Sequence, residues 1–241
     1  SGRARLIAAR DGAEGALDLG VQIVLAPGWK TYWRSPGDAG LPPEFDWTGS
    51  NGVGAPILAW PAPHRLDIAG LESLVYADEV VFPVRVTPPA GQPLRLRLRL
   101  TYGVCKDICI PAEADLALDL PSGQGRPTPF AELIARYAAQ VPRPASEGDV
   151  RFVAVTLAGT DALAIEVETG TPFRAPDLIV EGPSPYWFGK PQPSLAPGGR
   201  RASFRVPVGG GRDLGGLKDA MLTLTLIDGG RAVEERRAVG R

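Results

Sequence analysis

Residues 93–102 read PLRLRLRLTY, and apolar and charged side chains alternate strictly from Leu94 to Leu100. In an extended chain, a period of two places successive side chains on opposite faces. The leucines would then face a core and the arginines would face solvent. The stretch therefore predicts a half-buried antiparallel β-strand.

Stretches of similar character recur along the chain, and Gly, Pro and Asp separate them. The strands expected in the first half are residues 17–25, 29–34, 55–60, 79–87 and 114–120. Those expected in the second half are residues 150–157, 162–168, 202–208, 220–227 and 231–239. The 30 Gly and 25 Pro are too many for a helical protein and suit many turns. We therefore predict an all-β fold of the sandwich type.

The length of 241 residues is sufficient for two domains. We predict a first domain over residues 1–125 and a second over residues 150–241. Residues 126–149 are rich in turn formers and are expected to form a connector with one short helix. Thr128 would cap this helix and Pro129 would occupy its first position. The expected apolar face of the helix consists of Phe130, Leu133, Ile134 and Tyr137.

The charge balance narrows the class of partner. The formal net charge is -1, which provides no field to gather nucleic acid. No apolar run approaches the ~20 residues that a membrane-spanning helix needs. The chain opens abruptly on Ser1-Gly2-Arg3, from which we expect that an export signal has been removed.

Cys105 and Cys109 are the only cysteines, and three residues separate them. Strand parity continued from Leu94 places Cys105 on the arginine face, and Cys109 shares the parity of Asp115, so both sulfurs are expected to be reachable from solvent. In an extended strand their Cα atoms would lie ~13 Å apart, whereas a disulfide needs ~7 Å or less. A bond between them therefore requires a turn at residues 106–108.

Three roles for the pair remain open from the residues alone. The pair could form a structural disulfide, but one that closes so short a loop would contribute only about 2 kcal/mol to stability, against about 4 kcal/mol for a loop of some 50 residues. The pair could instead exchange with other thiols, as exposed disulfides in short loops do. Two thiolates could also bind Cu(I). His64 is the only histidine and Met221 the only methionine; both are distant in sequence from the cysteines, and we expect Met221 in a core and no bound metal.

The chain also contains two aromatic clusters. Trp29 and Trp33 share one strand parity and are expected to pack in a core. Tyr32 has the other parity and is expected near the cysteine face. Residues 185–188, PYWF, are expected to form an edge of a core, and a partner-docking patch is the alternative.

Two motifs carry a resemblance to a known family. Residues 28–43, GWKTYWRSPGDAGLPP, and residues 102–113, YGVCKDICIPAE, resemble the periplasmic N-terminal region of DsbD-type transmembrane thiol:disulfide interchange proteins, most closely the ScsB branch linked to copper tolerance. The resemblance implies two immunoglobulin-like β-sandwich domains and a thiol:disulfide oxidoreductase without a cofactor. It implies that Cys105 and Cys109 are the catalytic redox pair.

The resemblance also implies partners and a location. In such proteins a membrane domain passes electrons from cytoplasmic thioredoxin to a periplasmic thioredoxin-like domain and an immunoglobulin-like domain. The latter then reduces a disulfide isomerase-like protein or a peroxiredoxin. We therefore expect a periplasmic domain of an inner-membrane protein, with the membrane-embedded region absent from this sequence.

The family shields its disulfide with a cap loop that bears an aromatic residue. We expect the equivalent cap at residues 65–73, where no aromatic residue stands at the centre, so that Leu66 or Ile68 would provide the shield. The residues expected to line the site are Tyr32, Asp67, Ile68, Tyr102, Lys106 and Asp107.

Overall fold

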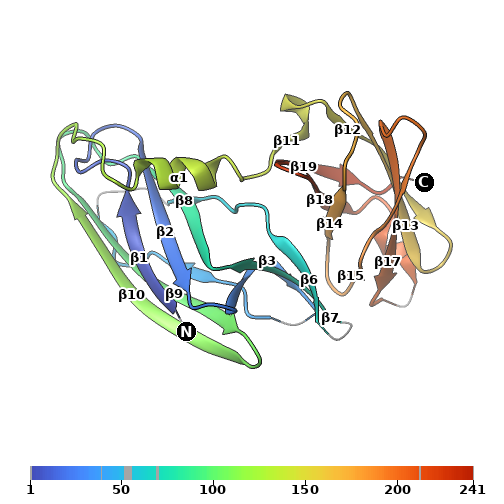
Figure 1. Ribbon diagram of the computed structural model, residues 1–241, viewed down its shortest axis with the longest axis horizontal. Coiled ribbons are helices and arrows are strands. Elements are labelled where there is room, and N and C mark those ends of the chain that lie inside the picture. The colour runs from blue at the N-terminus through green and yellow to red at the C-terminus, as the bar shows by residue number, and fades with distance from the viewer. Residues whose placement is uncertain (1, 39, 52–55, 69–70, 212, 241) are drawn as a thin grey trace. The chain divides into compact units, whose positions relative to one another are not determined.

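The computed structural model describes residues 2–38, 40–51, 56–68, 71–211 and 213–240. The chain divides into two units, residues 1–141 and residues 142–241 (Figure 1). Each unit consists mainly of antiparallel strands, which confirms the predicted all-β fold with two β-domains.

The first unit contains two sheets. The first has the order β1-β2-β8-β5. Its strands are β1 (Gly2–Ala8), β2 (Leu17–Leu25), β8 (Glu79–Val86) and β5 (Ile57–Leu58). The second has the order β10-β9-β3-β7-β6, and β4 also pairs with β9. Its strands are β10 (Cys109–Leu120), β9 (Leu94–Cys105), β3 (Lys30–Gly37), β7 (Leu71–Ala77), β6 (His64–Ile68) and β4 (Glu44–Asp46).

Strand β9 realises the predicted alternation. Leu94, Leu96, Leu98 and Leu100 are buried while the arginines between them are exposed. On the exposed face, Arg97 pairs with Asp119 and Arg99 with Asp115 of the neighbouring β10. The hydrophobic face fixes the register because a slip of one residue would bury the arginines.

Aromatic rings fill part of the core of the first unit. Phe82 of β8 lies edge-on to Trp60, Phe45 and Tyr76, with ring centroids 5.0, 5.3 and 5.4 Å away. Trp33 is also fully buried, as its strand parity predicts, whereas Trp29 is only half-buried. The predicted strand at residues 55–60 is reduced to Ile57–Leu58, with residues 52–55 outside the described part of the chain.

The helix expected in a connector packs on the first unit. Helix α1 (Ala131–Ala138) runs beside β2 and β8 (Figure 1), and its Ile134 contacts Ile7 and Val81. The predictions that Thr128 caps the helix and that Pro129 begins it are wrong, because the helix begins at Ala131 with Phe130 as its N-cap. The Thr128 N–H donates to the Ala9 carbonyl at 2.9 Å, and its hydroxyl accepts from the Phe130 N–H at 3.1 Å, in the turn that precedes the helix.

The second unit also contains two sheets. The first has the order β11-β19-β18-β14, with β11 (Arg143–Pro144) parallel to its neighbour. Its other strands are β19 (Arg231–Ala238), β18 (Met221–Asp228) and β14 (Asp177–Glu181). The second has the order β12-β13-β17-β15, and β16 also pairs with β17. Its strands are β12 (Val150–Ala158), β13 (Ala162–Thr169), β17 (Arg201–Gly209), β15 (Trp187–Phe188) and β16 (Gln192–Leu195). Two short 3-10 helices, Ala145–Glu147 and Leu214–Leu217, complete the unit.

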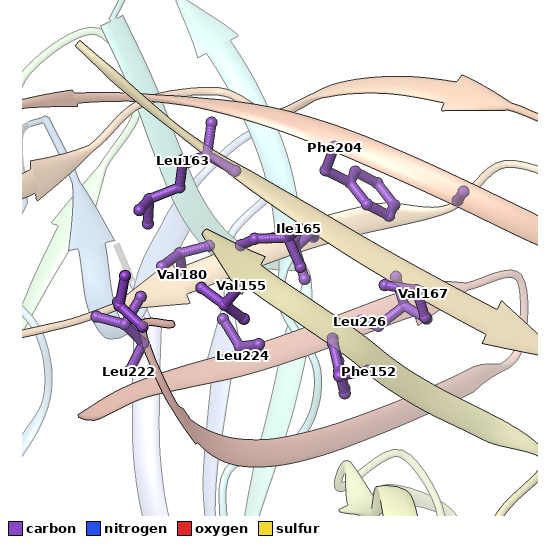
Figure 2. Close-up of a cluster of buried hydrophobic side chains, with 14 of the residues drawn as sticks. Phe152, Val155, Leu163, Ile165, Val167, Val180, Phe204, Leu222, Leu224 and Leu226 are labelled. Carbon is purple, nitrogen blue, oxygen red and sulfur yellow. The ribbon is translucent and has the colours of Figure 1, made fainter. Parts of the chain in front are cut away.

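The two sheets of the second unit enclose a separate apolar core. Figure 2 shows side chains of β12, β13 and β17 meeting those of β14 and β18. The labelled residues are Phe152, Val155, Leu163, Ile165, Val167, Val180, Phe204, Leu222, Leu224 and Leu226. None of the helices in the described part of the chain is long and apolar enough to cross a membrane.

One prediction about a single side chain in this unit is wrong. Met221, expected in a core, is exposed because it begins β18 at the edge of the buried run Leu222–Leu226. The PYWF cluster lies at the edge of the core, as expected: Tyr186 and Phe188 pack against it, whereas Trp187 is 56 % exposed. The Trp187 ring lies instead over Gly209, where an added Cβ would come within 2.1 Å of it.

We expect Asp228 to make the second unit sensitive to acid. Burial would raise the pKa of this carboxyl, but the N–H groups of Ala175 and Arg174, at 2.8 and 3.0 Å, and the Arg231 guanidinium outweigh it and lower the pKa. The resulting stabilisation is therefore present above about pH 4, the usual carboxyl value, and is lost as the pH falls toward the folded-state pKa. Denaturant unfolding of Asp228→Asn and wild type should differ at pH 7, and the difference should shrink as the pH falls below about 4; a gap that does not depend on pH contradicts this assignment.

Candidate redox site

The two cysteines face each other at the tip of the β9–β10 hairpin. Cys105 pairs with Cys109 in the strand register, their Cα atoms lie 4.2 Å apart, and their sulfurs form a disulfide. Residues 106–108 make the connecting turn, in which the Lys106 N–H donates to the Ile108 carbonyl at 3.2 Å. The hairpin thus supplies the turn that the spacing of the cysteines requires.

The disulfide lies on the outer face of its sheet. Cys109 is exposed and Cys105 is half-buried, whereas Val104, the neighbour of Cys105 in β9, points to the opposite face of the sheet and is buried. Ile108 and Ile110 beside the disulfide are exposed apolar side chains. A thiolate of another molecule could therefore approach the pair from solvent, most directly at Cys109.

Tyr32 is in contact with the disulfide. Lys30 of β3 pairs with Cys105 and Thr31 with Val104, so Tyr32 falls on the same sheet face as the sulfurs. Its hydroxyl lies 3.1 Å from Cys109 Sγ. Burial raises the pKa of Tyr32, so the phenol keeps its proton at neutral pH and can donate to sulfur.

A short segment covers the Tyr32 ring, which explains why a residue on the outer sheet face is only 3 % exposed. A Cβ added to Gly40 would lie 2.6 Å from two carbons of the ring, and one added to Gly103 would lie 3.2 Å from a third. The Gly103 N–H donates to the Leu41 carbonyl at 3.1 Å. The ring is therefore held between the two glycines, and neither position has room for a side chain.

The remaining expected site residues lie in different places. Lys106 and Asp107 are exposed in the hairpin turn, and the Lys106 stem passes over Gly28. Tyr102 is buried on the core face of β9, away from the sulfurs, and burial raises its pKa. Asp67 is exposed on β6, with β7 and β3 between it and β9. The hairpin thus brings Lys106 and Asp107 beside the sulfurs but not Tyr102 or Asp67.

The expected cap region is largely strand. Residues 64–68 and 71–77 form β6 and β7, with Leu66 half-buried. The centre of the expected cap, at residues 69–70, and the side chain of Ile68 lie outside the described residues. The cover observed at the site comes from Gly40 and Leu41 instead. Sequence reasoning missed these two residues and Gly103, although all three lie in the two motifs that carry the family resemblance.

The described residues offer little for a metal ion. Within them, no group of three or more His, Cys, Asp or Glu side chains is placed to hold one. His64 is exposed at the start of β6, and Met221 belongs to the second unit.

Two known families match parts of the chain, and the first of them includes the hairpin. Residues 3–121 match the family described as "Thiol:disulfide interchange protein DsbD, N-terminal". The first unit is a DsbD-type N-terminal domain. Residues 140–241 match a family described as a domain of unknown function (DUF8393). The cysteine pair of the DsbD-type domain thus belongs to a thiol:disulfide exchange class.

One solved structure extends the likeness to both units. The N-terminal periplasmic domain of ScsB from Proteus mirabilis is 27 % identical, with a TM-score of 0.79 over 98 % of this chain and 92 % of that chain. The reduced N-terminal domain of DsbD from Neisseria meningitidis is 20 % identical over 52 % of this chain and 90 % of that chain, with a TM-score of 0.30. No curated protein sequence matches the chain.

Proposed function

We propose that this chain is the periplasmic thiol:disulfide exchange region of a membrane electron transporter. The Cys105/Cys109 pair receives electrons from the thioredoxin-like domain of the same transporter. It passes them to a periplasmic oxidoreductase, either a disulfide isomerase-like protein or a peroxiredoxin. The single observation that carries this proposal is the disulfide at an exposed hairpin tip, with a tyrosine hydroxyl on its outer sulfur.

The proposed transfer proceeds by two thiol exchanges. In the reduced domain the Cys109 thiolate attacks a client disulfide, so one client sulfur bonds to Cys109 and the other leaves as a thiolate that takes up a proton. The Cys105 thiol then loses its proton and attacks Cys109 Sγ, which forms the Cys105–Cys109 disulfide and releases the second client thiol. Two electrons and two protons have then passed to the client. The thioredoxin-like domain restores the dithiol by the reverse sequence.

Exposure determines the order of attack in this proposal. The Cys109 side is open to solvent, whereas Cys105 is half-buried beside Lys30. A bulky client sulfur therefore reaches Cys109 first. The Tyr32 hydroxyl would donate to the Cys109 thiolate, which favours the charged form of the nucleophile.

Replacing Tyr32 with phenylalanine should slow exchange. Loss of a hydrogen bond to a charged sulfur costs on the order of 1.5 kcal/mol, which lowers the thiolate population about tenfold. Because the more basic thiolate is also more nucleophilic, the rate at pH 7 should fall about threefold. The measurement is the rate at which the reduced domain reduces an oxidised thioredoxin. Tyr102→Phe is the matched control, because that phenol lies on the core face. Equal rates for Tyr32→Phe and wild type would remove Tyr32 from the mechanism.

The proposed function is tested by equilibrating the full chain with a purified thioredoxin in a glutathione buffer. We expect rapid exchange and a reduction potential above about -300 mV, because structural disulfides typically have potentials below that value. A lower potential with no exchange would indicate a stabilising disulfide instead. Stoichiometric Cu(I) binding by the reduced chain, lost in Cys105→Ser and unaccompanied by exchange, would indicate a copper module.

A further inference from the structure

The segment that covers Tyr32 has a second fastening, far from the cysteines. We propose that Asp38 is a positioning residue for the redox pair. It anchors to β7 the segment made of residues 38 and 40–43, which we call the strap, and the strap holds the Tyr32 hydroxyl against Cys109. This inference rests on the proposed function and adds to it a residue that touches neither sulfur.

One end of the strap is fastened to β7. The Asp38 N–H donates to the Glu72 carbonyl at 2.8 Å, and Asp38 Oδ2 accepts from the Glu72 N–H at 2.7 Å. Just before it, Gly37 has a φ of +89°, and a Cβ there would lie 2.4 Å from the Glu72 carbonyl oxygen. The chain can therefore leave β3 this close to β7 only at a glycine.

The other end of the strap is fastened to β9. The Leu41 carbonyl accepts from the Gly103 N–H, and the Leu41 Cβ would lie 2.9 Å from a Cβ on Gly103. Pro43 is buried, and directly after it β4 continues the pairing with β9, where Glu44 faces Thr101. The strap thus spans from β7 to β9 across the strand that carries Tyr32.

The strap fixes the phenol because it closes the space beside the ring. Gly40 is in tight contact with one edge of the ring and Gly103 with the other. If the Asp38 side chain no longer holds Glu72, the end of the strap at β7 keeps the backbone bond from the Asp38 N–H and the neighbouring Gly37–Ser73 pair but loses its side-chain bond. The ring can then move away from Gly103, and its hydroxyl leaves Cys109 Sγ for part of the time.

The test measures the thiolate of Cys109 directly in the reduced full chain. Alkylation by iodoacetamide is followed against pH by mass spectrometry, and trypsin cleavage after Lys106 places the two cysteines in separate peptides. Loss of the phenol hydrogen bond disfavours the thiolate, so in Asp38→Ala the pH midpoint for Cys109 should rise by about half a unit or more. Asp38→Asn keeps an acceptor oxygen for the Glu72 N–H and should restore the wild-type midpoint.

Two further variants separate positioning from general damage to the fold. Asp46→Ala removes a similar bond outside the strap, which the Thr48 N–H donates to Asp46 Oδ1 at 2.8 Å, and should leave the midpoint unchanged. Gly40→Ala pushes a methyl group against the Tyr32 ring and should raise the midpoint even with Asp38 intact. A wild-type midpoint in Asp38→Ala overturns the positioning role of Asp38, and a wild-type midpoint in Gly40→Ala as well overturns the contact of the strap with the ring.

Failure of this inference differs from failure of the proposed function. If wild type exchanges rapidly with thioredoxin and Asp38→Ala has the wild-type midpoint and rate, only the positioning role of Asp38 is wrong. If the midpoint rises in Asp38→Ala while wild type does not exchange with thioredoxin, the positioning role of Asp38 is supported and the proposed electron transfer is wrong.

Discussion

Cys105→Ser is expected to accumulate a stable mixed disulfide with a thioredoxin-like partner, and Cys109→Ser is expected to form almost none. In the first variant the exposed Cys109 can attack, but no second thiol is left to release the partner. In the second variant the remaining thiol is the half-buried Cys105, whereas the Tyr32 hydroxyl contacts the sulfur position of Cys109 that the variant has lost. Turnover should be lost in both variants.

The measurement uses a single-cysteine thioredoxin whose sulfur is blocked by thionitrobenzoate. Attack by the domain releases the coloured thiol, so absorbance gives the rate and a non-reducing gel gives the trapped complex. We expect a rate for Cys105→Ser at least about tenfold above that for Cys109→Ser, since accessibility governs which sulfur exchanges. The double variant sets the baseline. Faster trapping by Cys109→Ser would show that Cys105 attacks first. No trapping by either variant would contradict the proposed electron transfer.

Local pattern was sufficient to predict the hairpin that carries the site. The alternation from Leu94 to Leu100 fixes which residues of β9 face the core, and that parity extends to Cys105 without interruption. The spacing of the cysteines then requires a turn of three residues, and the structure has one. These features depend only on neighbours in sequence, and each position on a strand determines the face of the next.

The cover over Tyr32 could not be predicted in the same way. It depends on β3 leaving β9 after Thr31, so that β4 pairs with β9 farther along and the strap, residues 38 and 40–43, leads from one pairing to the other. Such a span is set by pairing between distant strands, which the period of a single strand does not encode. The helix shows the same division. Its apolar face follows from the spacing of residues along the sequence, but the sheet on which Ile134 packs depends on distant strands and could not be predicted.

Phe204→Ala is expected to destabilise the second unit by about 3–5 kcal/mol while leaving thiol exchange unchanged, because Phe204 is fully buried in a core that belongs to that unit alone. The second unit contains neither of the cysteines, and we propose that it supports the first without taking part in exchange.

Denaturant unfolding followed by fluorescence, together with the exchange rate below the first transition, provides the measurement. Phe82→Ala is the matched control, since Phe82 is equally buried but lies at the centre of the aromatic cluster of the first unit. That variant should lose a similar amount of stability and should lose exchange activity as the first unit unfolds. If Phe204→Ala lowers the exchange rate as much as it lowers the population of the folded second unit, then the second unit takes part in docking the partner and the supporting role is wrong.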